Sequence, residues 1–271
     1  MNDKEQVSEP NMNERNNATT MESRHDIEKR FHDAKASSGH GPGHGDFYEA
    51  GGLDQVWRAY LEAAGDLRGK TILDFGCGEG WSTLEYAKRG AAVYSFDISP
   101  ESVRNLVLNA RAKGVSDRIY PAVMAAEYLG FPSHAFDLVL GVAILHHTEV
   151  RHVGQEVARV LKQGGRALFI EPLAHNIFLR IFRYLTPQRR TPTEQPLTVQ
   201  QIQELCRPFG RCRIRGYALL SIFPQGLFWL TGSRGLLRWS LRLAETADRW
   251  LLRMFPFLYR YCWSAIIEVQ R

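Results

Sequence analysis

The sequence predicts an α/β fold: a doubly wound, mostly parallel sheet of seven strands, covered by helices and carrying helical cap insertions. Apolar strands alternate with amphipathic helices through most of the chain after residue 53. The glycine-rich stretch TILDFGCGEGW (71–81) contains the end of the first strand. Ligands of such sheets bind beyond the carboxyl ends of the strands, so we expect the functional residues there.

Hydrophobic periodicity and turn residues place the elements in order. The expected strands cover residues 70–75, 91–97, 119–123, 136–145, 166–171, 213–221 and 262–269. The first helix carries an apolar stripe over residues 53–61, and the second ends at Gly90. The third has Ser99 as N-cap, Pro100 at its first position and Gly114 after its last turn. Helices are also expected over 149–162 and from Thr198, which forms a capping box with Gln201, to about residue 209.

The domain prediction is a disordered tail over residues 1–36 and one domain over 37–271, with cap insertions at about 173–200 and 222–258. The tail is rich in Asn, Glu and Ser and has no apolar periodicity, so it cannot offset the entropy of ordering. The glycines of SSGHGPGHG (37–45) predict a flexible gate, where His40 and His44 are poorly placed for a metal.

Composition favours a cytoplasmic protein. Of the 271 residues 44% are hydrophobic, and no apolar run reaches the roughly 18 residues that a membrane span requires. The N-terminus has no apolar core of a secretory signal. The four cysteines are not spaced like metal ligands, and they are too few for a fold held together by disulfides. We therefore expect reduced thiols and no metal.

Positive charge is concentrated in the last third of the chain. Residues 173–271 contain 15 arginines, no lysine and 5 acidic residues, a net charge of +10, whereas the whole chain carries +5. A basic surface for a partner is therefore expected in this segment.

The glycine-rich loop does not fit the common phosphate-binding patterns. A Walker loop requires four residues between its glycines, and the segment between Gly65 and Gly69 has three. The dinucleotide fingerprint requires glycine at the position of Trp81. The pattern present is D-x-G-x-G-x-G.

This stretch resembles motif I of the class I S-adenosylmethionine-dependent methyltransferases of the small-molecule type. The resemblance extends over residues 46–221 and the last strand, through YSFDIS, AAEYLGFPSHAFDLVLGVAILHHT and RVLKQGGRALFIEP. It implies methyl transfer from S-adenosylmethionine, with the glycines clearing space for the ligand and Asp97 accepting its ribose hydroxyls. The cofactor-binding residues implied are Asp74, Gly76, Cys77, Gly78, Gly80, Asp97, Ile98, Ala126, Glu127 and Val142.

Transfer to a hydroxyl also requires a base. The candidates near strand ends are His146, His147, His175 and Glu171, and His175 is favoured because some relatives place a catalytic histidine just after the fifth strand. Each histidine could instead have a structural role.

The acceptor is expected to be a small apolar or lipid-like molecule, methylated at oxygen. Two alternatives stay open, an RNA methyltransferase and a non-catalytic cofactor-binding module. GVAI (141–144) replaces the Asn/Asp-Pro-Pro-aromatic signature of base-amino methyltransferases, so nucleic acid is not the expected partner. Residues 234–255 predict an amphipathic helix with an arginine stripe, either a cap packed on the fold or a contact with anionic membrane.

Overall fold

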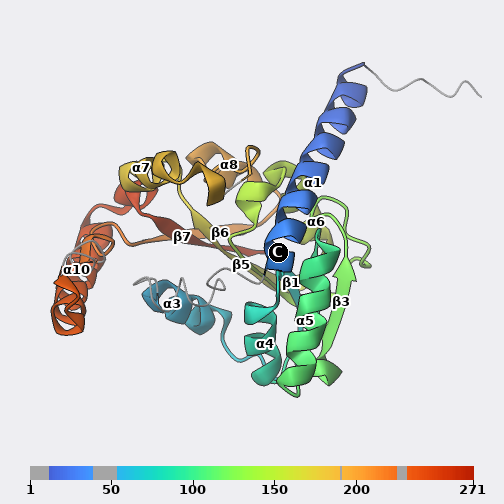
Figure 1. Cartoon of the computed structure of the whole chain (residues 1–271), viewed down its shortest axis with the longest axis horizontal. Helices are drawn as coiled ribbons and strands as arrows, with labels where there is room; N and C mark the ends of the chain where they lie inside the picture. Colours follow the sequence, from blue (N-terminus) through green and yellow to red (C-terminus); the bar gives the residue numbers. More distant parts are fainter. Residues whose placement is uncertain (1–11, 39–53, 190, 225–230) are drawn as a thin grey trace, which may run out of the picture.

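The computed structural model describes residues 12–38, 54–189, 191–224 and 231–271, and its centre is a seven-stranded sheet (Figure 1). The strand order is β3–β2–β1–β4–β5–β7–β6, with β7 antiparallel to both neighbours and the other pairs parallel. This confirms the predicted fold class. The strands are β1 (Thr71–Phe75), β2 (Ala92–Asp97), β3 (Ile119–Val123), β4 (Phe136–Val142), β5 (Leu161–Pro172), β6 (Arg211–Tyr217) and β7 (Ser264–Gln270).

Helices pack on both faces of the sheet. The helices are α1 (Met12–Ser38), α3 (Asp54–Ala64), α4 (Trp81–Lys88), α5 (Pro100–Ala112), α6 (Val150–Val160), α7 (Ile177–Leu185), α8 (Val199–Cys206) and α10 (Arg234–Met254). One buried cluster joins α3, α4 and α5 to the sheet, and a second joins α6 and α8 to the opposite face. Burial of these apolar faces is the main force that fixes the layers.

Two predicted helix starts have the expected caps. Ser99 Oγ accepts the backbone N–H of Ser102 at 3.0 Å at the start of α5. Thr198 and Gln201 form the capping box of α8. Both caps satisfy backbone groups that the first turn of a helix cannot pair internally.

The prediction of a disordered tail over residues 1–36 is wrong for residues 12–36, which belong to α1 (Met12–Ser38). This helix packs against α5, where the side-chain amide of Asn105 donates to the Ala36 carbonyl oxygen at 3.1 Å. Its anchors are polar contacts with residues far along the chain, so the apolar pattern of the segment does not reveal them. The gate predicted over 37–45, including His40 and His44, lies mostly outside the described residues.

Two further predictions need correction. Cys206 and Cys212 form a disulfide, because the chain turns back between α8 and β6 and brings their Cα atoms within 5.8 Å. The fourth strand ends at Val142 rather than at residue 145, and Leu145–His147 form a short 3-10 turn. This turn carries two of the candidate catalytic histidines.

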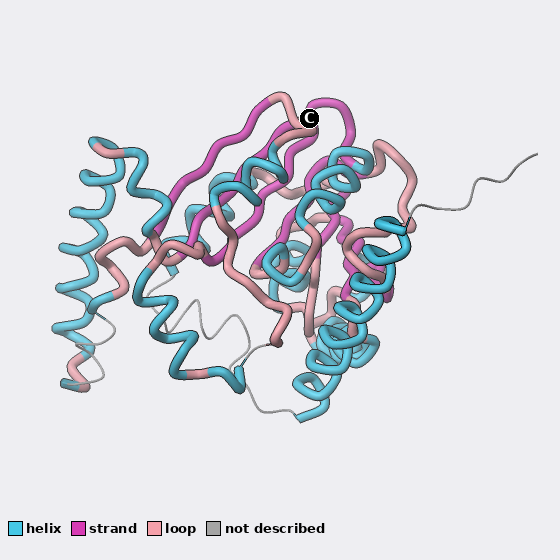
Figure 2. Tube along the Cα trace, turned by 90° about the horizontal axis from the view of Figure 1, so that it is seen from above, coloured by secondary structure: helices cyan, strands magenta, loops and turns pink. Residues whose placement is uncertain are grey.

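The insertions around β6 contain α7 and α10. The helix α10 lies at the edge of the molecule, far from α1 and β3 (Figure 1; Figure 2). Asp248 attaches it to the fold by accepting the backbone N–H groups of Leu219, Leu220 and Ser221. Within the described ranges no helix combines the length and the apolar character needed to cross a bilayer.

Candidate functional site

The three glycines of the loop after β1 do not all serve the same purpose. Gly76, Gly78 and Gly80 all have positive φ. A Cβ at Gly76 would lie 2.5 Å from Ile144, and one at Gly80 would clash with Leu106. A Cβ at Gly78 would meet no atom within 4 Å. Gly76 and Gly80 therefore clear space for the protein's own side chains, and Gly78 is the glycine that faces open space.

Asp97 lies at the carboxyl end of β2, directly beside this loop. Its Oδ2 accepts the backbone N–H of Gly78 at 2.9 Å, and its Oδ1 accepts that of Ser99 at 3.0 Å. A carboxylate has further lone pairs for ligand hydroxyls after these two bonds. The N–H bonds fix Asp97 between the glycine loop, Ile98 and the start of α5.

Asp74 is buried beneath the loop. Its Oδ2 accepts the hydroxyls of Ser82 and Thr83 from the first turn of α4, whereas its Oδ1 has no hydrogen-bond partner among the described residues. Burial raises the pKa of Asp74 to about 7. The unpartnered oxygen is a candidate acceptor for a cationic ligand group.

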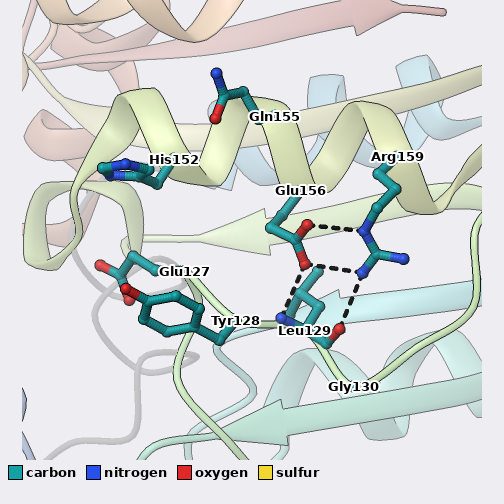
Figure 3. Close-up of a pocket in the computed structure, with 8 residues that line it drawn as sticks. All are labelled: Glu127, Tyr128, Leu129, Gly130, His152, Gln155, Glu156 and Arg159. Carbon is teal, nitrogen blue, oxygen red and sulfur yellow. Dashed lines mark hydrogen bonds and ion pairs between the residues drawn. The ribbon is translucent and has the colours of Figure 1, made fainter. Parts of the chain in front are cut away.

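The loop after β3 is held in place by α6. Figure 3 shows Glu156 accepting the Leu129 backbone N–H, while Arg159 donates to the Leu129 carbonyl oxygen at 2.9 Å. A hollow of about 470 Å³ lies on this outer side, lined by Glu127, Tyr128, Leu129, Gly130, His152, Gln155, Glu156 and Arg159. Glu127 is the one expected cofactor residue that lines this hollow.

Ala126 and Glu127, which the resemblance places beside adenine, are both buried. The Glu127 carboxylate is already engaged by His25 Nε2 at 3.0 Å and by the backbone N–H of Glu149 at 2.8 Å. Burial opposes its ionisation, but these two bonds lower the pKa of Glu127 below its usual value. The side chain of Glu127 therefore fastens α1 to the loop.

The helix α1 crosses the strand ends where the cofactor is expected (Figure 1). Besides His25, its Asp33 accepts the Ser99 hydroxyl two residues after Asp97. Its Glu28 is buried and accepts hydrogen bonds from the hydroxyls of Thr191 and Thr193. The helix thus joins the β2 end, the β3 loop and the cap segment.

The turn after β4 is held by Glu171. Ala143 has a φ of 54°, a strained value for a residue with a side chain, and the backbone changes direction there. Glu171 Oε1 accepts the backbone N–H groups of Ile144 at 2.8 Å and Leu145 at 2.7 Å. Its Oε2 lies 2.6 Å from His146 Nδ1. This contact favours the tautomer with a proton on Nδ1 and leaves Nε2 as an acceptor.

His147 is held in the same manner by α1. Its Nδ1 lies 3.0 Å from Glu28 Oε2, and its ring is 4.2 Å from the ring of His146. Burial and the neighbouring His146 lower the pKa of His147. Both imidazoles are thus oriented by buried carboxylates.

A further carboxylate, Glu194, faces this pair from the cap segment. Its Oε1 lies 3.9 Å from His146 Nε2, and its Oε2 lies 3.9 Å from His147 Nε2. Arg183 of α7 pairs with Glu194 and also donates to its backbone oxygen at 2.8 Å. Glu28 and Glu194 did not emerge from the sequence, because neither belongs to a short motif.

The structure separates the candidate bases. His146 and His147 lie together beside Val142 at the β4 end, whereas His175 lies in an exposed turn before α7. Glu171 positions the turn and its histidine. The geometry therefore favours His146 over His175.

Comparison with known proteins identifies the class. Residues 73–169 match the family described as "Methyltransferase domain". This match assigns a methyltransferase domain to this part of the chain, and it agrees with the enzyme class and the methyl donor that the sequence predicts.

Curated relatives of the chain are named as methyltransferases. The chain is 28% identical over 127 residues to the ubiquinone biosynthesis O-methyltransferase of Neisseria meningitidis serogroup C, covering 46% of this chain and 53% of that protein. It is 28% identical over 155 residues to the aklanonic acid methyltransferase DauC of Streptomyces sp. strain C5, covering 56% and 68%. The chain thus spans about half the length of the first of these relatives.

A solved structure shares the fold. Geranyl diphosphate C-methyltransferase from Streptomyces coelicolor superposes with a TM-score of 0.57 at 15% identity, covering 79% of this chain and 77% of that one. That structure is a complex with Mg²⁺, geranyl diphosphate and S-adenosyl-L-homocysteine.

The residues present fit S-adenosylmethionine. Gly78 leaves open space beside Asp97, which suits a ribose, and the buried Oδ1 of Asp74 lacks a partner among the described residues, which suits a positive charge. Ala125 offers no polar side chain beside Ala126 and Glu127, so adenine recognition is expected to depend on backbone groups of this loop.

Proposed function

We propose that the protein transfers the methyl group of S-adenosylmethionine to an oxygen atom of a small apolar or lipid-like acceptor. The observation that carries the proposal is the His146–Glu171 pair, buried at the end of β4 beside the expected methyl-donor site. The name of one relative specifies O-methylation. An RNA acceptor has no comparable support in the described residues.

S-adenosylmethionine supplies a methyl group on a sulfonium that is a good leaving group. A new O–C bond forms as the S–C bond breaks, the electron pair of the S–C bond stays on sulfur, and the acceptor hydroxyl gives up its proton. Alignment of the two reactants contributes up to about 7 to 11 kcal/mol. Asp97, Gly78 and Asp74 are the residues that position the donor.

His146 is the group placed to promote loss of the hydroxyl proton. Its Nδ1 is committed to Glu171, so Nε2 is the nitrogen that can act on an acceptor. Glu171 is completely buried and also anchored by two backbone N–H groups, which holds the imidazole in one orientation.

An apolar acceptor is favoured by the cap surface. The helix α7 exposes large apolar side chains, and the ring centroid of its Phe178 lies 4.7 Å from that of Phe223. On α10, Trp239 and Trp250 are 62% and 60% exposed, beside exposed Arg238, Arg242 and Arg249. An apolar arc flanked by arginines suits the surface of an anionic membrane, from which a lipid-like acceptor would be taken.

The test is methyl transfer by the purified full-length chain. Isotope-labelled S-adenosylmethionine is incubated with phenolic quinol precursors, polyketide phenols and lipid extracts, and the products are located by mass spectrometry. The expected result is an O-methylated product that disappears with His146→Ala. A methyl group on carbon or nitrogen would refute the oxygen assignment, and absence of turnover with intact cofactor binding would favour a non-catalytic module.

A further inference from the structure

The two adjacent histidines of the β4 turn direct the same ring nitrogen toward one carboxylate. His146 Nε2 and His147 Nε2 each lie 3.9 Å from an oxygen of Glu194. This separation is too long for a direct hydrogen bond. Neither Nε2 has another hydrogen-bond partner in the described part of the chain.

Each histidine is backed by its own buried carboxylate. His146 Nδ1 contacts Glu171, and His147 Nδ1 contacts Glu28, at 2.6 and 3.0 Å. Glu28 is fixed in turn by Thr191 and Thr193. A carboxylate on one imidazole nitrogen makes the other a better ligand, and this is the arrangement behind most metal-binding histidines.

The charges at the site are unbalanced without a cation. Glu28, Glu171 and Glu194 bring three negative charges, and Arg183 returns one positive charge. His32 lies beside Glu28, with its Nε2 at 3.6 Å from that carboxylate, and His25 is already paired with Glu127. A single divalent ion would balance the remaining charge.

We propose that His146, His147 and Glu194 bind a divalent transition-metal ion such as Zn²⁺ next to the methyl-donor site. Their donor atoms lie within 4.8 Å of one another. Metal bonds of about 2.0 to 2.2 Å require only a small inward movement of these side chains. Two imidazoles with one carboxylate select a transition metal over Mg²⁺ or Ca²⁺, which prefer oxygen ligands.

The role of the ion in the reaction rests on the proposed function, methyl transfer to an oxygen atom. Held by three protein ligands, it keeps coordination positions open for an oxygen of the acceptor and lowers the pKa of that hydroxyl. In that case His146 acts on the hydroxyl through the ion. The sequence did not predict the site, because Glu194 and Glu28 come from segments far from the histidine pair.

The test is metal binding by the untagged full-length protein. Metal content is measured by plasma mass spectrometry, and the chelator-treated protein is titrated with Co²⁺ while its visible absorption is recorded. We expect about one ion per chain and absorption bands of Co²⁺ with nitrogen ligands. Glu28→Gln should weaken Co²⁺ binding about 10- to 100-fold, and Glu194→Gln and His146→Ala should weaken it at least as much.

The matched control is His152→Ala, which removes an exposed histidine next to the β3 loop and should bind Co²⁺ as the unchanged protein does. Circular dichroism and calorimetry with S-adenosylmethionine establish that each variant is folded. The proposal would be overturned if the unchanged protein gave no Co²⁺ spectrum. It would also be overturned if Glu194→Gln and His146→Ala bound Co²⁺ as tightly as the unchanged protein does. If turnover persists in protein that binds no metal, the proposed function stands and this inference fails. Stoichiometric metal without turnover on any acceptor would instead support the metal site and refute the proposed function.

Discussion

Glu171 and His146 form a buried pair in which a carboxylate oxygen lies 2.6 Å from Nδ1 of the imidazole. The other carboxylate oxygen accepts the N–H groups of Ile144 and Leu145, so one side chain fixes both the turn and the ring. The reactivity of His146 should therefore depend on the charge of Glu171.

Glu171→Gln tests this dependence. The amide keeps an oxygen for the backbone but turns an N–H₂ group toward His146 Nδ1, which favours the wrong tautomer. Turnover should fall about 10²- to 10⁴-fold, with cofactor affinity preserved. Single-turnover assays and calorimetry measure the two quantities. Glu204→Gln on the surface of α8 is the control, and equal losses in both variants would contradict the assigned role.

Asp97→Asn tests the cofactor site. The loss of a charged acceptor should weaken binding of S-adenosylmethionine about 10- to 100-fold. Asn is preferable to Ala here, because an oxygen remains for the backbone N–H of Ser99. Calorimetry at fixed salt measures the affinity, with Asp117→Asn in the turn before β3 as control. Unchanged affinity would remove Asp97 from the site.

Asp74 should make the stability of the ligand-free protein depend on pH. Burial raises its pKa to about 7, so the native state holds a proton that the unfolded chain releases near pH 4. The protonated carboxyl contributes stability that is complete below pH 4 and is lost as pH rises through about 7. Compared with Asp74→Asn, the unchanged protein should lose up to about 4 kcal/mol of unfolding free energy between pH 4 and 8. Urea unfolding at both pH values measures this, and parallel pH profiles would show that Asp74 is already ionised in the fold.

Glu28 should hold α1 on the domain. Burial opposes its ionisation, but hydrogen bonds from His147 and His32 strongly lower the pKa of Glu28. Glu28→Gln should increase hydrogen exchange over residues 24–38 by about 10-fold or more, since a buried charged hydrogen bond contributes about 1.5 to 3 kcal/mol. Asp26→Asn, exposed on the same helix, should leave the exchange unchanged. Equal protection in both variants would mean that α1 is held by its other contacts.

The arginines of α10 should direct the protein to anionic membranes. Flotation with anionic vesicles should recover the protein in low salt, and neutral vesicles should not. Reversal of Arg238, Arg242 and Arg249 to Glu should abolish binding, because each arginine contributes about 1 kcal/mol near such a surface. The control variant changes the exposed Arg207, Arg211 and Arg213 to Glu, which alters the net charge by the same amount at a place outside α10. Equal loss in both triple variants would show that net charge, rather than α10, is responsible.

The sequence alone determined the sheet, most of its helices and the place of the glycine-rich loop. Their signals are local: apolar periodicity and the caps at Ser99 and Thr198 report on neighbours within one or two turns of chain, and Asp74, the glycines and Asp97 all lie within residues 74–97. The amphipathic helix over 234–255 was predictable for the same reason, and the structure confirms it as α10. That its tryptophans are exposed was not predictable, since periodicity does not reveal what covers a face.

Only the tertiary structure decided which residues meet at the end of β4. Glu28, His147 and Thr191 lie far apart in the chain, and the contacts joining them are hydrogen bonds and charge pairs that leave no periodic pattern. The same reason explains why α1 was expected to be disordered: its stability derives from polar partners on other segments. The preference for His146 over His175 also required the fold, because both follow strands and only burial and the Glu171 contact distinguish them.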